Sequence, residues 1–273
     1  MDRLSKLPDY ERFEEVAPGL FRCTFVWSLG LGLVIPIATF LIRAVDKQTN
    51  EPNHDWIMID AGAPLHTQKI TEAIDAFLTH KEDRIRYIAI THGHIDHTGA
   101  TLEVLKKYPE CKVIMHELEK PFICDGVQYK SCVGDNMYFN MMKHVAQKSE
   151  IQVPHEDSLL LTDDDENWEY GHILRLVETL GHTPGSASYL HVPTRSIMVG
   201  DALTNNALSL FGRKPPAIGT PFAMATCNFG DCKKAIAKVS TLGARVDTVF
   251  PAHDFSEKGL PIEDVKVFAD QLQ

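Results

Sequence analysis

Basic residues are scarce in this chain of 273 residues, which has 27 Lys and Arg against 37 Asp and Glu and a formal net charge of −10. Surfaces that bind phosphate backbones need an excess of positive charge, so this balance argues against nucleic acid as a partner. Internal repeats and long low-complexity segments are also missing, and 44% of the residues are hydrophobic. The composition is that of a globular protein with ample material for a core, and we expect a single domain over 1–273.

The sequence also lacks the marks of export. Its N-terminal segment carries charges throughout and has no apolar core, unlike a secretory signal. None of the six cysteines forms a CxxC pair; they are Cys23, Cys111, Cys124, Cys132, Cys227 and Cys232. We therefore expect small, buried, reduced thiols in a cytoplasmic protein.

One long stretch, from Cys23 to Ile42, has no charged residue at all. Its length is close to that of a membrane-spanning helix. However, Gly30, Gly32 and Pro36 interrupt it, and β-forming residues dominate both of its ends. This pattern favours two buried strands joined by an apolar loop, so we expect no association with a membrane.

Hydrophobic periodicity predicts alternating strands and helices, which is typical of a mixed α/β protein. Strands are expected at Leu20–Val26, Ala38–Val45, Trp56–Asp60, Tyr87–Thr91, Lys112–Met115, Leu174–Thr179, Ala187–His191, Ser196–Val199 and Thr248–Pro251. Helices are expected at Thr67–Leu78, through Leu102–Leu105, at Asp231–Leu242 and at Ile262–Leu272. Residues 117–158 break the alternation with proline, glycine and a Met-rich and aromatic piece, and we expect an inserted helical segment there.

Histidine is abundant, with 13 residues, and it is densest in Thr91–Gly99, THGHIDHTG. In extended backbone His92 and His94 point to the same side, whereas Asp96 and His97 follow where a helix begins. Such a turn can present two pairs of ligands to two adjacent points, and imidazole and carboxylate both suit Zn²⁺.

Three later turns place similar residues directly after strands. His182 lies in the turn GHTPGS, Asp201 follows an apolar strand, and His253 follows the strand that ends at Pro251. Polar residues at strand ends lie on loops that a rigid sheet holds in place. Together with Thr91–Gly99, these turns predict one composite metal site.

The ordered set HxHxDH, then His, Asp and His, resembles that of the metallo-β-lactamase superfamily of binuclear metallohydrolases. The turns Asp60–Gly62 (DAG) and GHTPGS are similar to that family too. The resemblance implies a four-layer αβ/βα sandwich with the metals at one edge, between the sheets. Ala252 stands where the family commonly has glycine before the last histidine; we expect a small shift of that turn and no loss of the ligand.

The resemblance also implies a role for each residue. The first metal would be bound by His92, His94 and His182, and the second by Asp96, His97 and His253, with Asp201 bridging. We expect two zinc ions per chain, although Mn, Fe or Co suits the same ligands. A metal-bridging hydroxide would attack the substrate, with Asp96 as the general acid and base. Asp60 would support the metal loop as a hydrogen-bond acceptor, and His116 is a further candidate for support.

The net charge and the number of metal ligands exclude some of the reactions that members of this family catalyse. Phosphodiester cleavage conflicts with the negative charge, and a mononuclear iron dioxygenase needs fewer ligands than the complete set present here. We predict a hydrolase that opens a small cyclic amide or ester, a lactam or a lactone. A quorum-signal-type lactonase and a glyoxalase II-like thioesterase are the alternatives.

Apolar side chains suggest where such a substrate would bind. Trp27 and Leu33 lie in the uncharged stretch, Tyr138 lies in the inserted segment, and Phe211 lies in the loop 207–226. They suit a small apolar or aromatic cyclic molecule. Packing in the core or in a homodimer interface explains the same residues equally well.

Overall fold

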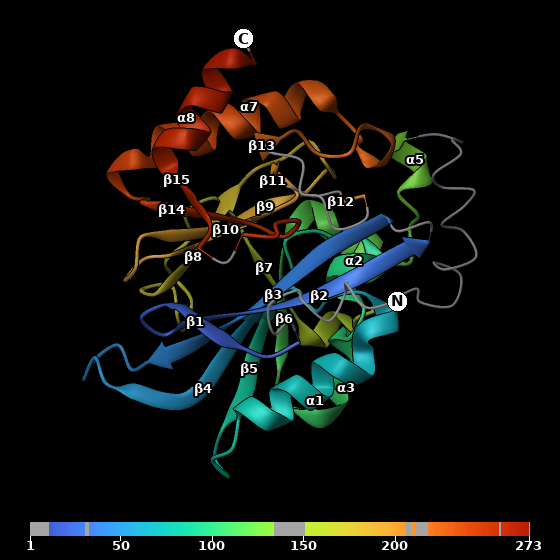
Figure 1. Ribbon diagram of the computed structural model, residues 1–273. Coiled ribbons are helices and arrows are strands. Elements are labelled where there is room, and N and C mark those ends of the chain that lie inside the picture. Colours follow the sequence, from blue (N-terminus) through green and yellow to red (C-terminus); the bar gives the residue numbers. More distant parts are fainter. Residues whose placement is uncertain are drawn as a thin grey trace.

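The computed structural model describes residues 11–30, 33–133, 151–205, 209–210, 218–256 and 258–272. The described residues form an eight-stranded and a five-stranded sheet that face each other (Figure 1). The larger sheet has the order β1 (Glu14–Ala17), β2 (Leu20–Gly30), β3 (Leu33–Val45), β4 (Pro52–Ile59), β5 (Arg84–Ala89), β6 (Lys112–His116) and β7 (Ser158–Leu161), with β12 (Ser209–Leu210) paired to β3. The strands are antiparallel from β1 to β4 and parallel from β4 to β7.

The smaller sheet has the order β15 (Leu260–Pro261), β14 (Thr248–Pro251), β10 (Ser196–Gly200), β9 (Ala187–His191) and β8 (Leu174–Glu178). Its central pair β10 and β14 is parallel, so both of these strands end at the same edge of the sheet. A short separate ladder joins β11 (Thr204–Asn205) to β13 (Ile218–Gly219).

Helices cover both outer faces, which makes four layers (Figure 1). The larger sheet is covered by α1 (Thr67–Phe77) and α3 (Thr101–Lys107), and the smaller by α7 (Phe229–Ser240) and α8 (Ile262–Gln271). The shorter helices are α2 (Ile95–Thr98), α4 (Lys120–Ile123), α5 (Lys130–Val133), η2 (Pro64–His66), η3 (Glu117–Glu119), η4 (His155–Asp157), η5 (Ala223–Ala225) and η6 (Thr241–Ala244). Apolar side chains from both sheets, such as Ile57 and Tyr189, fill the space between them. The predicted four-layer sandwich is confirmed.

The uncharged stretch forms β2 and β3, which pair antiparallel with Trp27 opposite Ile35. None of the described helices has the length and apolar character that crossing a membrane requires. In the inserted segment the described part holds the short helices α4 and α5, and Ile151 and Val153 then pack in the core. Residues 134–150, which include Tyr138, lie outside the described residues.

The prediction that all six cysteines are reduced was wrong for one pair. A disulfide joins Cys132 of α5 to Cys227, which lies 95 positions further along the chain with its Cα 5.1 Å away. The other four cysteines are free and buried, as expected. Two cysteines so far apart give no pairing signal in the sequence, because only the fold brings α5 next to the loop before α7.

Candidate metal centre

Four segments at one edge of the two sheets carry the seven side chains that the sequence singled out. His92 and His94 follow β5, Asp96 and His97 lie in α2, His182 lies between β8 and β9, Asp201 follows β10, and His253 follows β14. Backbone hydrogen bonds join loops of each sheet to strands of the other, since Ala187 N of β9 donates to Thr91 O and Ala38 N of β3 donates to Ala252 O (both 2.9 Å). All seven side chains therefore meet in one place, between the sheets.

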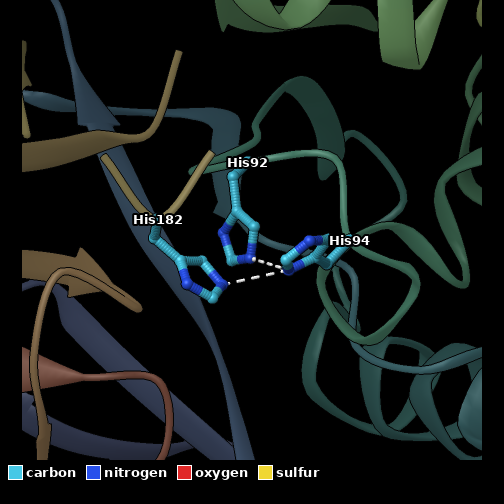
Figure 2. A group of neighbouring side chains, drawn as sticks. All are labelled: His92, His94 and His182. Atoms are coloured by element: carbon cyan, nitrogen blue, oxygen red, sulfur yellow. Dashed lines mark hydrogen bonds between the residues drawn. The ribbon is translucent and has the colours of Figure 1, made fainter. Parts of the chain in front are cut away.

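Three histidines form the first set, which consists of His92, His94 and His182 (Figure 2). The Nδ1 atom of His94 lies 3.0 Å from Nε2 of His92 and 3.0 Å from Nε2 of His182. Nitrogen ligands at 2.0–2.1 Å from a tetrahedral metal ion lie about 3.3 Å from one another. The spacing of the three nitrogens thus suits a single cation.

The second set consists of Asp96, His97 and His253. Oδ2 of Asp96 lies 3.5 Å from Nε2 of His253 and 3.9 Å from Nε2 of His97. Asp201 lies between the sets, because its Oδ2 is 3.3 Å from Nε2 of His253 and also 3.3 Å from Nε2 of His182. One carboxylate therefore faces both sets, as a bridging ligand would.

Each histidine ring except that of His94 is oriented through its Nδ1 atom. His97 donates to Oδ2 of Asp60 (2.7 Å), and His253 donates to the carbonyl oxygen of Pro36 (2.7 Å). His182 contacts Oγ1 of Thr226 (3.1 Å), whose own proton goes to the carbonyl oxygen of Phe222. With Nδ1 used in this way, Nε2 is left as a lone-pair donor directed into the site.

The ring of His92 is oriented through a short relay. Its Nδ1 lies 3.1 Å from Oγ1 of Thr91, which donates to Oδ2 of Asp60 (2.8 Å). Oδ1 of Asp60 also accepts from the backbone N–H of Thr91 (2.7 Å). Asp60 therefore supports both His92 and His97, as the sequence predicted.

This arrangement fits a bound cation. Nε2 of His92 and Nε2 of His182 are both acceptors, and they converge on Nδ1 of His94, which carries at most one proton. Nε2 of His97 and Oδ1 of Asp201 are buried and lie 3.3 Å apart, and neither forms a hydrogen bond to any other described residue. Buried lone pairs without donors are costly, and a metal ion would satisfy them.

The electrostatics divide the site in two. Burial lowers the pKa of His94 to about 3 and that of His182 to about 4, so both imidazoles are neutral. In the second set, burial alone would lower the pKa of His253, but the nearby carboxylates of Asp201 and Asp96 outweigh it and raise this pKa to about 10. The pKa of Asp201 is lowered, because His253 and His97 outweigh its burial. A metal ion would displace the protons held between these carboxylates and histidines.

The other predicted residues have varied positions. Trp27 is half-buried on β2, and Leu33 is the first residue of β3. Phe211, like Tyr138, lies outside the described residues. The hydrogen bonds of His116 go to other residues, since its Nε2 pairs with Oε1 of Glu178 (3.1 Å) and its Nδ1 accepts from the backbone N–H of Leu118 (3.3 Å). In the turn before His253 the backbone N–H of Ala252 donates to Gly200 O (3.0 Å).

Sequence reasoning missed the residues that support the first set, namely Glu119, Tyr129, Thr183 and Thr226. One signal pointed to Glu119, since it lies three residues after strand β6 at the same edge of the sheet. Thr183 is the residue directly after His182. Tyr129 and Thr226 have no comparable signal, because the folding of remote loops brings them to the site.

Comparisons with known proteins identify the family of this sequence. The family model described as the metallo-β-lactamase superfamily matches residues 41–253. The probable metallo-hydrolase YflN of Bacillus subtilis is 29% identical over 181 residues, which is 63% of this chain and 63% of YflN. A hydroxyacylglutathione hydrolase of Buchnera aphidicola is 26% identical over 153 residues, 55% of this chain and 47% of that enzyme.

Solved structures agree in fold. MEM-A1, a subclass B3 metallo-β-lactamase from a soil metagenome library, has a TM-score of 0.63 at 18% identity and covers 97% of this chain and 94% of its own. The metallo-β-lactamase from Hirschia baltica has a TM-score of 0.62 at 14% identity and covers 95% of this chain and 96% of its own. At these identities the likeness concerns the fold alone. The family match, which extends to the last histidine of the site, shows that this chain belongs to the metallo-β-lactamase superfamily.

Proposed function

We propose that this metallo-hydrolase uses two zinc ions to open a small cyclic amide or ester, a lactam or a lactone. The observation that carries the proposal is the convergence of two sets of ligand-type side chains with Asp201 between them. The first set would hold one ion and the second set the other. Metal ions in such a pair polarise a carbonyl group and make coordinated water acidic enough to act near neutral pH.

Proton transfer in the reaction would fall to Asp96. Asp96 is the most exposed carboxylate of the centre, with 16% of its side chain accessible against 9% for Asp201 and 3% for Asp60. It is therefore best placed to exchange a proton with the nucleophile and the leaving group. A lactam depends on this step more than a lactone, because its nitrogen leaves poorly without a proton.

Apolar residues that are close in sequence or in strand register to residues of the centre support an uncharged substrate. The carbonyl of Pro36, which accepts from His253, lies next to the Trp27–Ile35 pair of the β2–β3 hairpin. Phe222 is 52% exposed, and it lies on the loop that holds Thr226 against His182. Side chains of this kind around a few polar groups suit a small ring compound.

Thioester hydrolysis is the second candidate. It is favoured by two relatives named hydroxyacylglutathione hydrolase, which are 26% and 27% identical to this chain. Both of them match over only part of their length, 47% and 58%. The same centre would attack the thioester carbonyl, so the substrate separates the two candidates and the metal ligands do not.

The test is a substrate panel on protein reloaded with Zn²⁺ after chelation. The panel holds a chromogenic cephalosporin, an acyl-homoserine lactone, S-lactoylglutathione and bis(p-nitrophenyl) phosphate. We expect two equivalents of zinc by elemental analysis and turnover of a cyclic substrate. Turnover of the thioester alone would establish the second candidate, and turnover of the phosphodiester alone would refute both.

Matched variants show whether turnover comes from this centre. Asp201→Ala should abolish it, because both sets lose the shared carboxylate. Asp55→Asn should leave it intact, because Asp55 is an equally buried carboxylate that lies in β4 beside the start of β5, bound to Arg84 and Tyr170. Equal rates in the two variants would place the activity elsewhere.

A further inference from the structure

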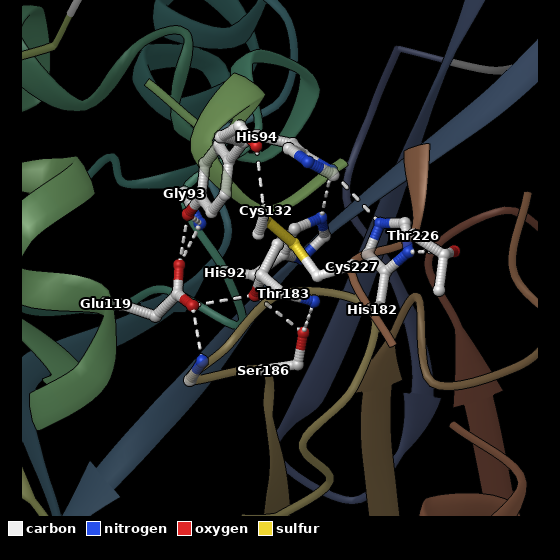
Figure 3. Close-up of a disulfide and its surroundings, with 12 residues drawn as sticks. His92, Gly93, His94, Glu119, Cys132, His182, Thr183, Ser186, Thr226 and Cys227 are labelled. Atoms are coloured by element: carbon white, nitrogen blue, oxygen red, sulfur yellow. Dashed lines mark hydrogen bonds between the residues drawn. A yellow bond between two sulfur atoms is a disulfide. The ribbon is translucent and has the colours of Figure 1, made fainter. Parts of the chain in front are cut away.

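Glu119 is a buried carboxylate, 0% exposed, for which the proposed chemistry has no use. It accepts hydrogen bonds from four groups (Figure 3). Oε1 accepts from Oγ1 of Thr183 (2.6 Å) and from the backbone N–H of Gly185 (2.8 Å). Oε2 accepts from the backbone N–H of Gly93 (2.8 Å) and from the hydroxyl of Tyr129. One side chain thus holds two loops that are far apart in the sequence.

These two loops carry the whole first set. Gly93 lies between His92 and His94, and Thr183 directly follows His182. The approach is close, because a Cβ atom added at Gly185 would overlap the backbone of Glu119. The carboxylate is therefore a spacer of fixed length between the histidines that meet at Nδ1 of His94.

The network requires an acceptor at both oxygens of Glu119. The hydroxyl of Tyr129 accepts from the N–H of Gly93 (2.9 Å), so its own proton goes to Glu119. Burial raises the pKa of Glu119, and the four hydrogen bonds oppose that rise because they stabilise the charged form. If glutamine replaced Glu119, its NH₂ group would take the place of one carboxylate oxygen. It would then face the backbone N–H of either Gly93 or Gly185, and that N–H would lose its acceptor.

We propose that Glu119 is a positioning residue that sets the distance between the turn His92–His94 and the turn of His182, and thereby the metal affinity of the first set. Its hydrogen bonds within the described part of the chain go to Gly93, Tyr129, Thr183 and Gly185, none of which belongs to the seven residues of the centre. This inference rests on the proposed metal-dependent function. Side chains that hold metal ligands in place commonly change metal affinity by about 10- to 100-fold when they are removed.

Asp55 offers a matched control that is remote from the metal centre. Asp55 is also a buried carboxylate, and it accepts from the hydroxyl of Tyr170 (2.6 Å) and pairs with Nε of Arg84 (2.7 Å). Asp55 lies in β4 opposite Arg84, the first residue of β5, whereas the metal centre lies where β5 ends. A change at Asp55 therefore reports the cost of losing a buried carboxylate without touching a ligand loop.

The experiment compares Glu119→Gln with Asp55→Asn in the full chain. The apoprotein is titrated with Zn²⁺ against a competing chelator. We expect Glu119→Gln to weaken one of the two equivalents by about 10- to 100-fold and to leave the other within about threefold. Asp55→Asn should leave both unchanged. Hydrogen–deuterium exchange of the apoproteins is the second readout, and residues 92–97 and 181–186 should exchange faster only in Glu119→Gln.

Each outcome decides the matter. Unchanged zinc affinity in Glu119→Gln would overturn the inference, as would an equal loss in Asp55→Asn, which would indicate general destabilisation. If Glu119→Gln does not fold, Tyr129→Phe against Tyr170→Phe replaces the pair, and only Tyr129→Phe should weaken the same equivalent. A native chain that binds no zinc would overturn the proposed function, and unchanged exchange in both loops would overturn the positioning role separately.

Discussion

Asp60→Asn is the substitution that best tests how the second set is oriented. Asp60 accepts from the backbone N–H of Thr91 through Oδ1, and from Nδ1 of His97 through Oδ2. In the asparagine variant the side-chain oxygen must still accept from the backbone N–H of Thr91, because the position of that donor is fixed by the backbone. The amide N–H would then face Nδ1 of His97, and the ring would have to carry its proton on Nε2 instead. Nε2 would no longer offer a lone pair to a metal ion.

The size of the effect follows from the bond that is lost. The side chains of His97 and Asp60 are 0% and 3% exposed, so solvent does not screen the contact. A hydrogen bond to a charged group contributes about 1.5–3 kcal/mol. That free energy corresponds to a loss of roughly 10- to 150-fold in affinity for the metal held by the second set. The first set should keep its affinity within about threefold, provided that His92 still reaches Thr91.

The assay is a competition titration with Zn²⁺, followed by the rate of hydrolysis at saturating zinc. Asp55→Asn is again the control, since it exchanges a buried carboxylate that is remote from the centre. Two equivalents bound by Asp60→Asn as tightly as by the native chain would refute the reasoning. So would a loss of the same size in the control.

Three further predictions concern stability. Thiol titration of the denatured, unreduced chain should find four free cysteines, and replacing Cys132 and Cys227 with serine should lower the free energy of unfolding by about 4–5 kcal/mol, because the disulfide closes a loop spanning 95 positions. Burial lowers the pKa of His191 from 6.5 to about 4, so acid protonates the unfolded chain first. About 3 kcal/mol of stability present above pH 6.5 is then lost as the pH falls to 4, and His191→Asn should remove this part of the pH dependence. Gly99→Ala should lower the free energy of unfolding by roughly 1–3 kcal/mol in a denaturant titration, because its Cβ would overlap the backbone of Ala63.

The course of the chain was predictable because local signals are strong in it. The α1 helix, expected over Thr67–Leu78 from its apolar spacing, runs over Thr67–Phe77. The β14 strand, expected at Thr248–Pro251, has those bounds. Weak local signals were missed: β1 is largely exposed, and β11, β12 and β13 have two residues each. Strands so short are held by their partners, which no window of sequence contains.

The centre was predictable for a related reason. Residues that directly follow strands lie on loops that a rigid sheet holds in place, so the positions of His92, Asp201 and His253 after strands indicated a common site. The order of the ligands then led to the family. The disulfide between Cys132 and Cys227 and the network around Glu119 could not be inferred in this way, because each joins segments whose approach depends on how the loops pack.

The sequence by itself determined the class of fold, the order of its elements and the residues able to bind metal, because periodicity and strand-end chemistry are local properties. Only the tertiary structure decided which lone pairs face each other and which groups hold them there. Asp201 lies between two sets of ligands because β10 ends beside β14 and opposite β5. Glu119 holds the turns of His92 and His182 because a buried carboxylate needs hydrogen-bond donors, and here these come from both turns.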